Sequence, residues 1–153
     1  METISQVLRE FNVILTSLRA STHSDRVTLR LDCAPWAWRV DQVAAESCAP
    51  GESSLLGDDS IPQRDLATVQ YIERTGTVLV QPDVTSTFVR PPAVLVTHYH
   101  VKAQMLGPIL RRGQLMGWIS VHDTHSVHAW DDLEVGALER AIVEIHHVLD
   151  EYV

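Results

Sequence analysis

Residues 101–130 constrain the fold more than any other part of the chain. They contain two apolar runs with alternating polarity, residues 102–110 and 114–122, separated by Arg111-Arg112-Gly113. A glycine at this point supplies the positive φ that a tight turn between antiparallel strands requires. The pattern therefore predicts a β-hairpin.

The second strand of this hairpin has two unlike faces, because successive side chains of a strand point to opposite sides of the sheet. One face is apolar or small and typical of plain core: Leu115, Gly117, Ile119 and Val121. The other mixes apolar bulk with polar groups: Met116, Trp118, Ser120 and His122. The wall of a small-molecule pocket has such a mixed composition, so we expect the functional site on this second face.

Length and charge limit the classes of protein to consider. A chain of 153 residues, 45% hydrophobic, is in the range of one globular domain. The net charge of −8 and the single lysine argue against a nucleic-acid-binding surface. Neither a signal peptide nor an apolar run of about 18 residues is seen, so we expect a cytoplasmic protein without a membrane span. Cys33 and Cys48 are expected to be free and reduced.

Both ends of the chain have the pattern of long amphipathic helices. Residues 1–20 and 130–153 carry apolar side chains at spacings of three and four, which fall on one face of a helix. Asp131 and Asp132 begin the second helix, where the positive end of the helix dipole favours acids. Each stripe either covers its own sheet or meets a second copy. We expect some of both, and hence a homodimer through the terminal helices.

Residues 26–123 are expected to form the sheet and the pocket region. Alternation predicts a strand at residues 26–31, and a second strand is predicted at 38–47 as its antiparallel neighbour. Residues 77–80 are β-branched and predict a short strand. The whole chain, residues 1–153, is then a single α+β domain.

Helical segments separate these strands. Ser60 is expected to cap a helix that has Pro62 in its first turn and ends at Gly76, with an inward face made by Leu66, Val69 and Ile72. Residues 93–100 follow Pro91-Pro92, and their pattern leaves a short helix and an irregular turn both open.

From residue 93 to 149 the chain resembles GAF domains, and more narrowly those of phytochromes and cyanobacteriochromes. The matching features are Val101-Lys102-Ala103 before an apolar strand, Pro108, Gly113, Gly117-Trp118, His122, Trp130 and the acidic start of the last helix. The resemblance implies a central antiparallel sheet of about six strands, terminal helices on one face, and a pocket with short helices and loops on the other. Members of the family sense cyclic nucleotides, bilins, haem, amino acids or other metabolites, usually as dimers.

One departure from the family pattern bears on the cofactor. Bilin-binding members carry a Cys-His pair upstream of the Val-Lys-Ala segment, and about ten residues back this chain has Pro91-Pro92. Cys33 and Cys48 lie far from that place. A covalently bound bilin is therefore not expected, and the identity of the ligand stays open.

Nine residues are expected to line the pocket on the ground of their polar or aromatic character: Tyr71, Asp83, Arg90, His98, Tyr99, Gln104, Trp118, Ser120 and His122. Each also has a purely structural explanation, such as core packing for Trp118 or a turn cap for Asp83. Arg30 would serve an anionic ligand if its strand face is the pocket face, but the alternation with Val27 and Leu29 does not decide which face that is.

Three functions follow from these patterns. The first is a free-standing sensory or regulatory GAF domain that binds a small molecule and has no catalytic residues. The second is a GAF-fold enzyme, redox or metal-dependent, since His98, His100, His122, His125 and His128 include spacings known from metal sites. Surface histidines explain those spacings as well, so no metal is expected. The third is a dimerisation or interaction subunit that binds no ligand.

Overall fold

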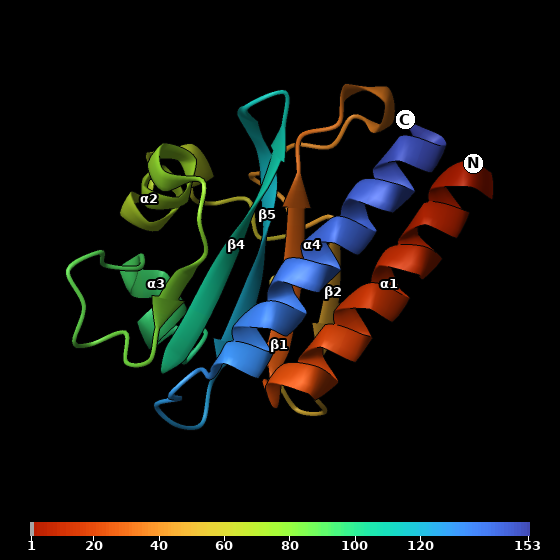
Figure 1. Cartoon of the computed structure of the whole chain (residues 1–153). Coiled ribbons are helices and arrows are strands. Elements are labelled where there is room, and N and C mark those ends of the chain that lie inside the picture. The colour runs from red at the N-terminus through yellow and green to blue at the C-terminus, as the bar shows by residue number, and fades with distance from the viewer. Residues whose placement is uncertain (1) are drawn as a thin grey trace.

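Two long helices cover one face of the molecule. The computed structural model describes residues 2–153. The helices α1 (Glu2–Thr22) and α4 (Asp132–Tyr152) lie side by side across the same face of the sheet (Figure 1). Both helices are confirmed close to their predicted bounds, and Met1 lies outside the described residues. Every helix in this range is too short or too polar to cross a lipid bilayer.

The sheet has five antiparallel strands within residues 2–153, where about six were expected. The strands are β1 (Arg26–Leu31), β2 (Ala45–Cys48), β3 (Leu79–Gln81), β4 (Ala103–Arg111) and β5 (Gln114–Asp123). Their order across the sheet is β2-β1-β5-β4-β3. The central strand is β5, which pairs with β4 and with β1, so residues far apart in the sequence meet in the middle of the sheet.

The predicted strand at residues 38–47 is wrong for most of its length, because only its last residues, which belong to β2, pair with β1 as a strand. A 3-10 turn at Ala34–Trp36 is followed by Ala37 in the left-handed region (φ 55°). The chain then folds back on itself, since the Asp32 carboxylate accepts a hydrogen bond from the Val40 amide at 2.9 Å. These local bonds replace the ladder bonds of a longer strand.

Short helices lie on the other side of the sheet. The helix α2 (Ala67–Thr75) ends at Gly76 (φ 65°) as predicted, but it begins after a separate 3-10 turn at Gln63–Asp65. The predicted cap is wrong, because Leu66 is the residue before α2 and the Ser60 hydroxyl donates to Asp58. The helix α3 (Ala93–Thr97) follows the proline pair.

The hairpin of β4 and β5 is confirmed, with a bulge that the alternation did not predict. Ile109 pairs with Gly117, but the next residue, Leu110, pairs with Leu115, so that Met116 has no opposite residue. An extra residue reverses the alternation of a strand. Leu115 therefore packs on the α2 side, contrary to the prediction, and Met116 packs toward α1 and α4.

The two faces of the sheet have separate cores. Toward the terminal helices, β1 and β5 contribute Val27, Leu29, Ile119 and Val121. On the opposite face Trp118 packs with residues of α2, β3 and β4. The predicted division of β5 into a plain core face and a mixed face is thus confirmed beyond the bulge, and the mixed face lies under α2 and α3.

Candidate functional site

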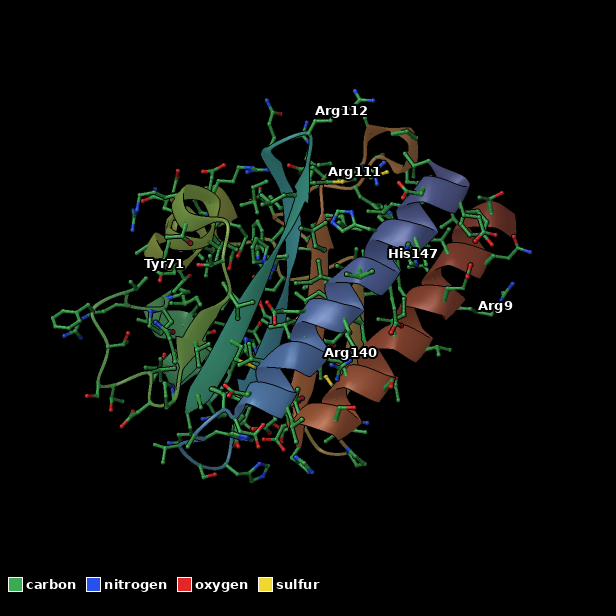
Figure 2. All side chains as sticks on the ribbon, viewed as in Figure 1. Arg9, Tyr71, Arg111, Arg112, Arg140 and His147 are labelled. Atoms are coloured by element: carbon green, nitrogen blue, oxygen red, sulfur yellow. The ribbon has the colours of Figure 1, made fainter. Side chains whose placement is uncertain are left out.

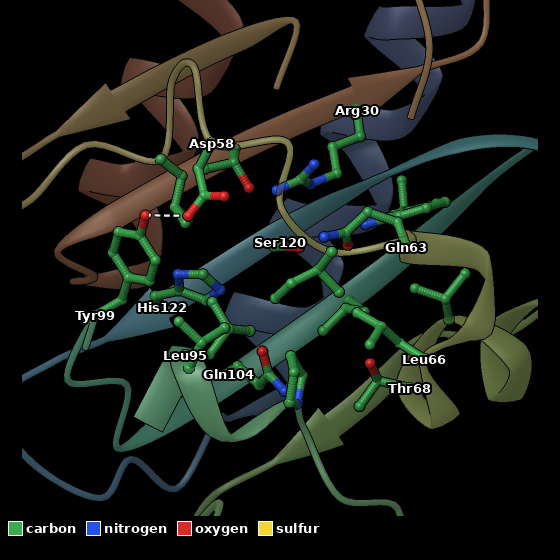
Figure 3. A pocket seen from close by; sticks show the side chains of 18 residues that line it. Arg30, Asp58, Gln63, Leu66, Thr68, Leu95, Tyr99, Gln104, Ser120 and His122 are labelled. Atoms are coloured by element: carbon green, nitrogen blue, oxygen red, sulfur yellow. Dashed lines mark hydrogen bonds between the residues drawn. The ribbon is translucent and has the colours of Figure 1, made fainter. Parts of the chain in front are cut away.

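A cavity lies between the mixed face of the sheet and the short helices (Figure 3). The space open to the centres of water molecules is about 30 Å³, which is room for about two waters. Its floor comes from three strands and its other walls come from α2, from α3 and from residues 55–63. The lining residues are Thr28, Arg30, Leu55, Asp58, Ile61, Gln63, Leu66, Thr68, Val69, Pro92, Val94, Leu95, Tyr99, Gln104, Leu106, Trp118, Ser120 and His122.

Pairing of β1 with β5 builds the polar floor. The register places Thr28 opposite Ser120, Arg30 opposite Trp118, and Arg26 opposite His122. Since the intervening residues of β1 are in the core under the terminal helices, its polar residues all point to the cavity side. The question that the sequence left open for Arg30 is answered: it lies on the pocket face.

His122 is held as a neutral hydrogen-bond donor. The Nε–H of Arg26 donates to His122 Nδ1 at 3.0 Å. Burial, and then the positive charges of Arg26 and Arg30, hold the pKa of His122 well below its usual 6.5. A guanidinium nitrogen only donates, so Nδ1 carries no proton and the ring proton is on Nε2. His122 is therefore unsuited to act as a general base through Nε2.

Arg26 is a fully buried support for this arrangement. Besides His122, its guanidinium donates to the carbonyls of Ser53 at 2.9 Å and Tyr99 at 3.2 Å. Its charge also lies 5.5 Å from the centre of the Tyr99 ring, within the range of a cation–π interaction. Arg26 thus joins β1 to β5 and to two loops, and its three bonding nitrogens are all used.

Arg30 is buried but has far fewer partners. Its residue is 6% exposed, and its hydrogen bond within residues 2–153 runs from Nη1 to the Val40 carbonyl at 2.9 Å. Burial lowers the pKa of Arg30 to about 10, which leaves it charged at neutral pH. No carboxylate of the described chain forms an ion pair with it.

Asp58 and Tyr99 close the cavity on one side. The Tyr99 hydroxyl donates to Asp58 Oδ2 (Figure 3). The Ser60 amide and hydroxyl donate to Oδ1 at 3.0 and 2.6 Å. Hydrogen bonds from Ser60 and Tyr99 lower the pKa of Asp58 to about 2. The contact connects the loop before α2 to the segment after α3, so the two walls are tied together over the floor.

Polar groups of the floor face the cavity, and one buried atom among them, Gln104 Oε1, has no partner within residues 2–153. Thr28 and Ser120 are 1% and 7% exposed, and their hydroxyls make no hydrogen bond to any residue in the described range. Gln104 donates to Gln81 Oε1 at 2.7 Å, while its own Oε1 is buried without a partner in residues 2–153. Buried polar groups normally find partners. This set therefore indicates a site for a bound molecule.

Five of the nine predicted site residues line the cavity: Tyr99, Gln104, Trp118, Ser120 and His122. The structure places the other four elsewhere. Tyr71, labelled on α2 in Figure 2, is partly buried against the apolar residues around Trp118, and the Arg74 guanidinium lies over its ring. Asp83 caps a turn by accepting from Thr85, while Arg90 and His98 are exposed.

Other lining residues were not predicted from the sequence: Thr28, Asp58, Gln63 and Thr68. The alternation of Thr28 with the apolar residues of β1 places it on the opposite face of the strand from Val27 and Leu29. That this face is the cavity side follows only once the terminal helices are known to cover Val27 and Leu29. Asp58 and Gln63 come from irregular segments, whose path depends on contacts with distant parts of the chain.

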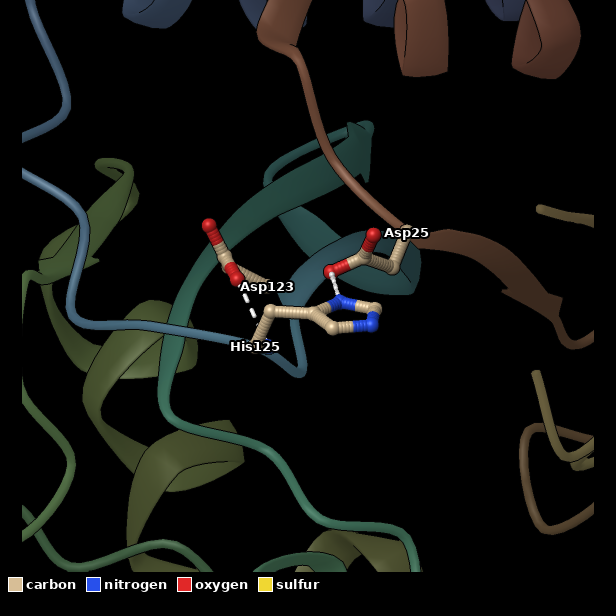
Figure 4. A group of neighbouring side chains, drawn as sticks. All are labelled: Asp25, Asp123 and His125. Atoms are coloured by element: carbon tan, nitrogen blue, oxygen red, sulfur yellow. Dashed lines mark hydrogen bonds and ion pairs between the residues drawn. The ribbon is translucent and has the colours of Figure 1, made fainter. Parts of the chain in front are cut away.

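A second cluster of charged residues lies at the end of β5, where Asp25, Asp123 and His125 approach one another (Figure 4). The ring of His125 contacts Asp25 at 3.1 Å. Asp123 Oδ1 accepts from two backbone amides, those of His125 and Ser126. These bonds form a turn after the strand, which holds His125 beside Asp25.

The cysteines do not provide an attachment point for a bilin. Neither Cys33 nor Cys48 lines the cavity, and both thiols are free. Burial, followed by the charge of Glu46, raises the pKa of Cys48 to about 12, so this thiol stays protonated and weakly nucleophilic. The residues of this site therefore do not fit a covalently attached bilin.

Comparison with known proteins gives a family and a fold. The sequence model described as GAF domain matches residues 7–145. No curated protein sequence matches the chain.

Several solved structures resemble this one. The blue-light absorbing form of the Thermosynechococcus elongatus PixJ GAF domain is 17% identical with a TM-score of 0.70, and the match covers 99% of this chain and 92% of that one. The red-light absorbing state of NpR6012g4, a red/green cyanobacteriochrome, is 21% identical with a TM-score of 0.72, covering 95% and 94%. The chromophore-binding domain of the bacteriophytochrome RpBphP3 from R. palustris is 20% identical with a TM-score of 0.66, covering 98% and 60%. At these identities the likeness concerns the fold.

Proposed function

The chain belongs to the GAF domain family, and from that premise we propose that it is a sensory, regulatory domain that binds a small molecule in the cavity of Figure 3. The observation that carries the proposal is the polar cavity floor, on which Thr28 and Ser120 line the cavity and Gln104 Oε1 is buried without a partner within residues 2–153. A ligand that supplies such a partner stabilises the folded state, since unpaired buried polar groups are costly. A covalent chromophore is not part of the proposal.

The sheet provides a route from the cavity to the terminal helices. On β1, Thr28 and Arg30 face the cavity while Val27 and Leu29 pack under α1 and α4. A ligand that changes the position of this strand therefore changes the packing of both helices. The ligand would act through its different affinities for two arrangements of the helices, without any chemical step.

We propose in addition that the terminal helices mediate a homodimer. A groove of about 580 Å³ runs between α1 and α4 on the outer surface, on the face where Figure 2 labels Arg9, Arg140 and His147. Val13 is 70% exposed and Val143 is 52% exposed, which leaves apolar surface along the outer sides of both helices. Light scattering tests this part, and a 17.1 kDa species at high concentration would contradict it.

A thermal-shift screen of metabolites tests ligand binding. A ligand present at 100 times its dissociation constant adds about 2.7 kcal/mol of stability, which for a chain of this size raises the Tm by about 5–10 °C. The variant Ser120→Leu fills the cavity, and Ser86→Leu makes the same change at an exposed loop position. We expect a compound that stabilises the natural chain and Ser86→Leu but not Ser120→Leu. Equal shifts in both variants would contradict the proposed site.

A further inference from the structure

We propose that the cavity recognises a small organic anion whose carboxylate group pairs with Arg30. This inference rests on the proposed function, because it names the chemistry of the ligand for the same cavity. It is carried by a buried positive charge that forms no ion pair within residues 2–153, next to hydroxyl and imidazole groups that face the same cavity.

The charge of Arg30 is the first observation. A buried cation is costly unless a counter-charge and several hydrogen bonds compensate it. Arg30 has one backbone carbonyl as partner, that of Val40, and no ion pair with any acid in residues 2–153. Asp58, Asp41 and Glu46 act on it only through space. A carboxylate in the cavity would supply the missing charge, and guanidinium and carboxylate groups match in geometry.

Neighbouring donors converge on the same floor. The hydroxyls of Thr28 and Ser120 lie opposite each other on β1 and β5, next to Arg30 along β1 and next to His122 along β5. His122 presents Nε2–H, since its Nδ1 is used by Arg26. Hydroxyl, imidazole N–H and guanidinium groups together form a donor-rich surface. Such a surface favours oxygen atoms that carry negative charge.

The other charged groups of the site are already engaged. Arg26 uses its three nitrogens on His122, Ser53 and Tyr99. Both carboxylate oxygens of Asp58 accept hydrogen bonds, from Ser60 and from the Tyr99 hydroxyl. Asp58 thus holds the wall of the cavity, and Arg30 remains the lining cation with free donors.

The remaining walls indicate an organic anion with a short apolar body. Aliphatic and aromatic side chains form much of the rest of the lining, and one of them, Trp118, lies directly beside Arg30. They are Leu66, Val69, Leu95, Leu106 and Trp118. An inorganic oxyanion makes no use of such walls, whereas a short hydrocarbon chain is desolvated by them. The free space of about 30 Å³ limits the ligand to a few non-hydrogen atoms.

Calorimetric titration of the natural chain compares matched ligands. The probes are acetate, propionate and butyrate against acetamide, propionamide and butyramide, which have nearly the same shape without the charge. We expect acetate, which is about the size of the free space, to bind at least about tenfold more tightly than acetamide, and butyrate, which exceeds that space, to bind more weakly than acetate. Nitrate and phosphate are tested separately. If nitrate or phosphate binds as tightly as acetate, the site takes inorganic oxyanions and the organic part of the proposal is wrong.

Variants then assign the effect to Arg30. Arg30→Met removes the charge and keeps most of the volume, so it should abolish the preference for carboxylate over amide, while Arg30→Lys should retain part of it. Arg74→Met, on the exposed side of α2, is the matched control and should change nothing. An unchanged preference in Arg30→Met contradicts the inference. If Arg30→Met does not fold, the comparison of Arg30→Lys with the natural chain and the carboxylate-to-amide ratio of the natural chain still decide it.

The two proposals fail in different ways. If amides and other neutral compounds bind as well as carboxylates, and Ser120→Leu prevents that binding, the cavity is a ligand site but not an anion site. If neither the carboxylates nor any compound of the metabolite screen stabilises the chain, the proposed function itself is wrong.

Discussion

Acidification below pH 6.5 should destabilise this protein through His122. The ring is buried, and burial together with the charges of Arg26 and Arg30 holds its pKa well below the usual 6.5. In the unfolded chain the same ring titrates near 6.5, so below that pH the unfolded state binds more protons and the free energy of unfolding falls. For one such group the loss between pH 6.5 and 5.5 is about 1 kcal/mol. Above about pH 7.5 this contribution is complete.

The variant His122→Asn isolates the effect. Its side-chain oxygen can accept the Nε–H of Arg26 in place of Nδ1, and it does not titrate. Urea denaturation at pH 7.5, 6.5 and 5.5 measures the free energy of unfolding of both proteins. The natural chain should lose about 1 kcal/mol more than the variant between pH 6.5 and 5.5, since all other titrating groups are common to both. Identical pH profiles would refute the buried, neutral state assigned to His122.

Three further predictions concern the framework of the site, each measured by the same denaturation. Gly117→Ala should lower the free energy of unfolding by about 1–3 kcal/mol or more, because the added Cβ collides with the Arg30 carbonyl oxygen. Gly107→Ala should lower it less, since its Cβ meets the movable Cδ1 of Ile142 on α4 at 2.6 Å. Equal losses in the two variants would contradict this prediction. Asp131→Ala removes the capping box at the start of α4 and should cost about 1 kcal/mol. Burial lowers the pKa of His128, but its hydrogen bonds to the carboxylates of Asp123 and Glu134 outweigh burial and leave that pKa raised. The stabilising effect of His128 should therefore be present below pH 6.5 and be lost as the pH rises. His128→Gln should abolish this pH dependence.

The elements with strong periodicity could be predicted from the sequence. The terminal helices have apolar stripes many residues long, and the hairpin combines alternation with Arg112 and Gly113, both of positive φ (54° and 74°). That pair of φ values is typical of the tight turns that join antiparallel strands. Local chemistry decides such elements, so tertiary contacts do not need to be known in advance.

The face of each strand and the path of the loops could not be predicted in the same way. The bulge at Met116 moves Leu115 to the opposite face, and no residue type in that stretch demands a bulge. The pocket side of β1 is decided by its pairing with β5 and by the helices that cover Val27 and Leu29. These are contacts between residues about ninety positions apart, which a local pattern does not contain.

The candidate site shows the same division. Residues on the regular strand β5, Trp118, Ser120 and His122, were predicted because alternation gave them one face. Asp83 was misplaced because its carboxylate is used in a local turn with Thr85. Asp58 was missed because its role depends on a hydrogen bond to Tyr99, which comes from a separate wall of the cavity.

Backbone amide NMR during titration with a compound from the screen tests the location of the ligand most directly. We predict that the largest changes in chemical shift fall on the cavity floor, at the amides of Thr28, Gln104 and Ser120, with smaller changes spreading to α1 and α4. Changes confined to the outer groove between these helices, around Val13 and Val148, would contradict a binding site between the sheet and the short helices.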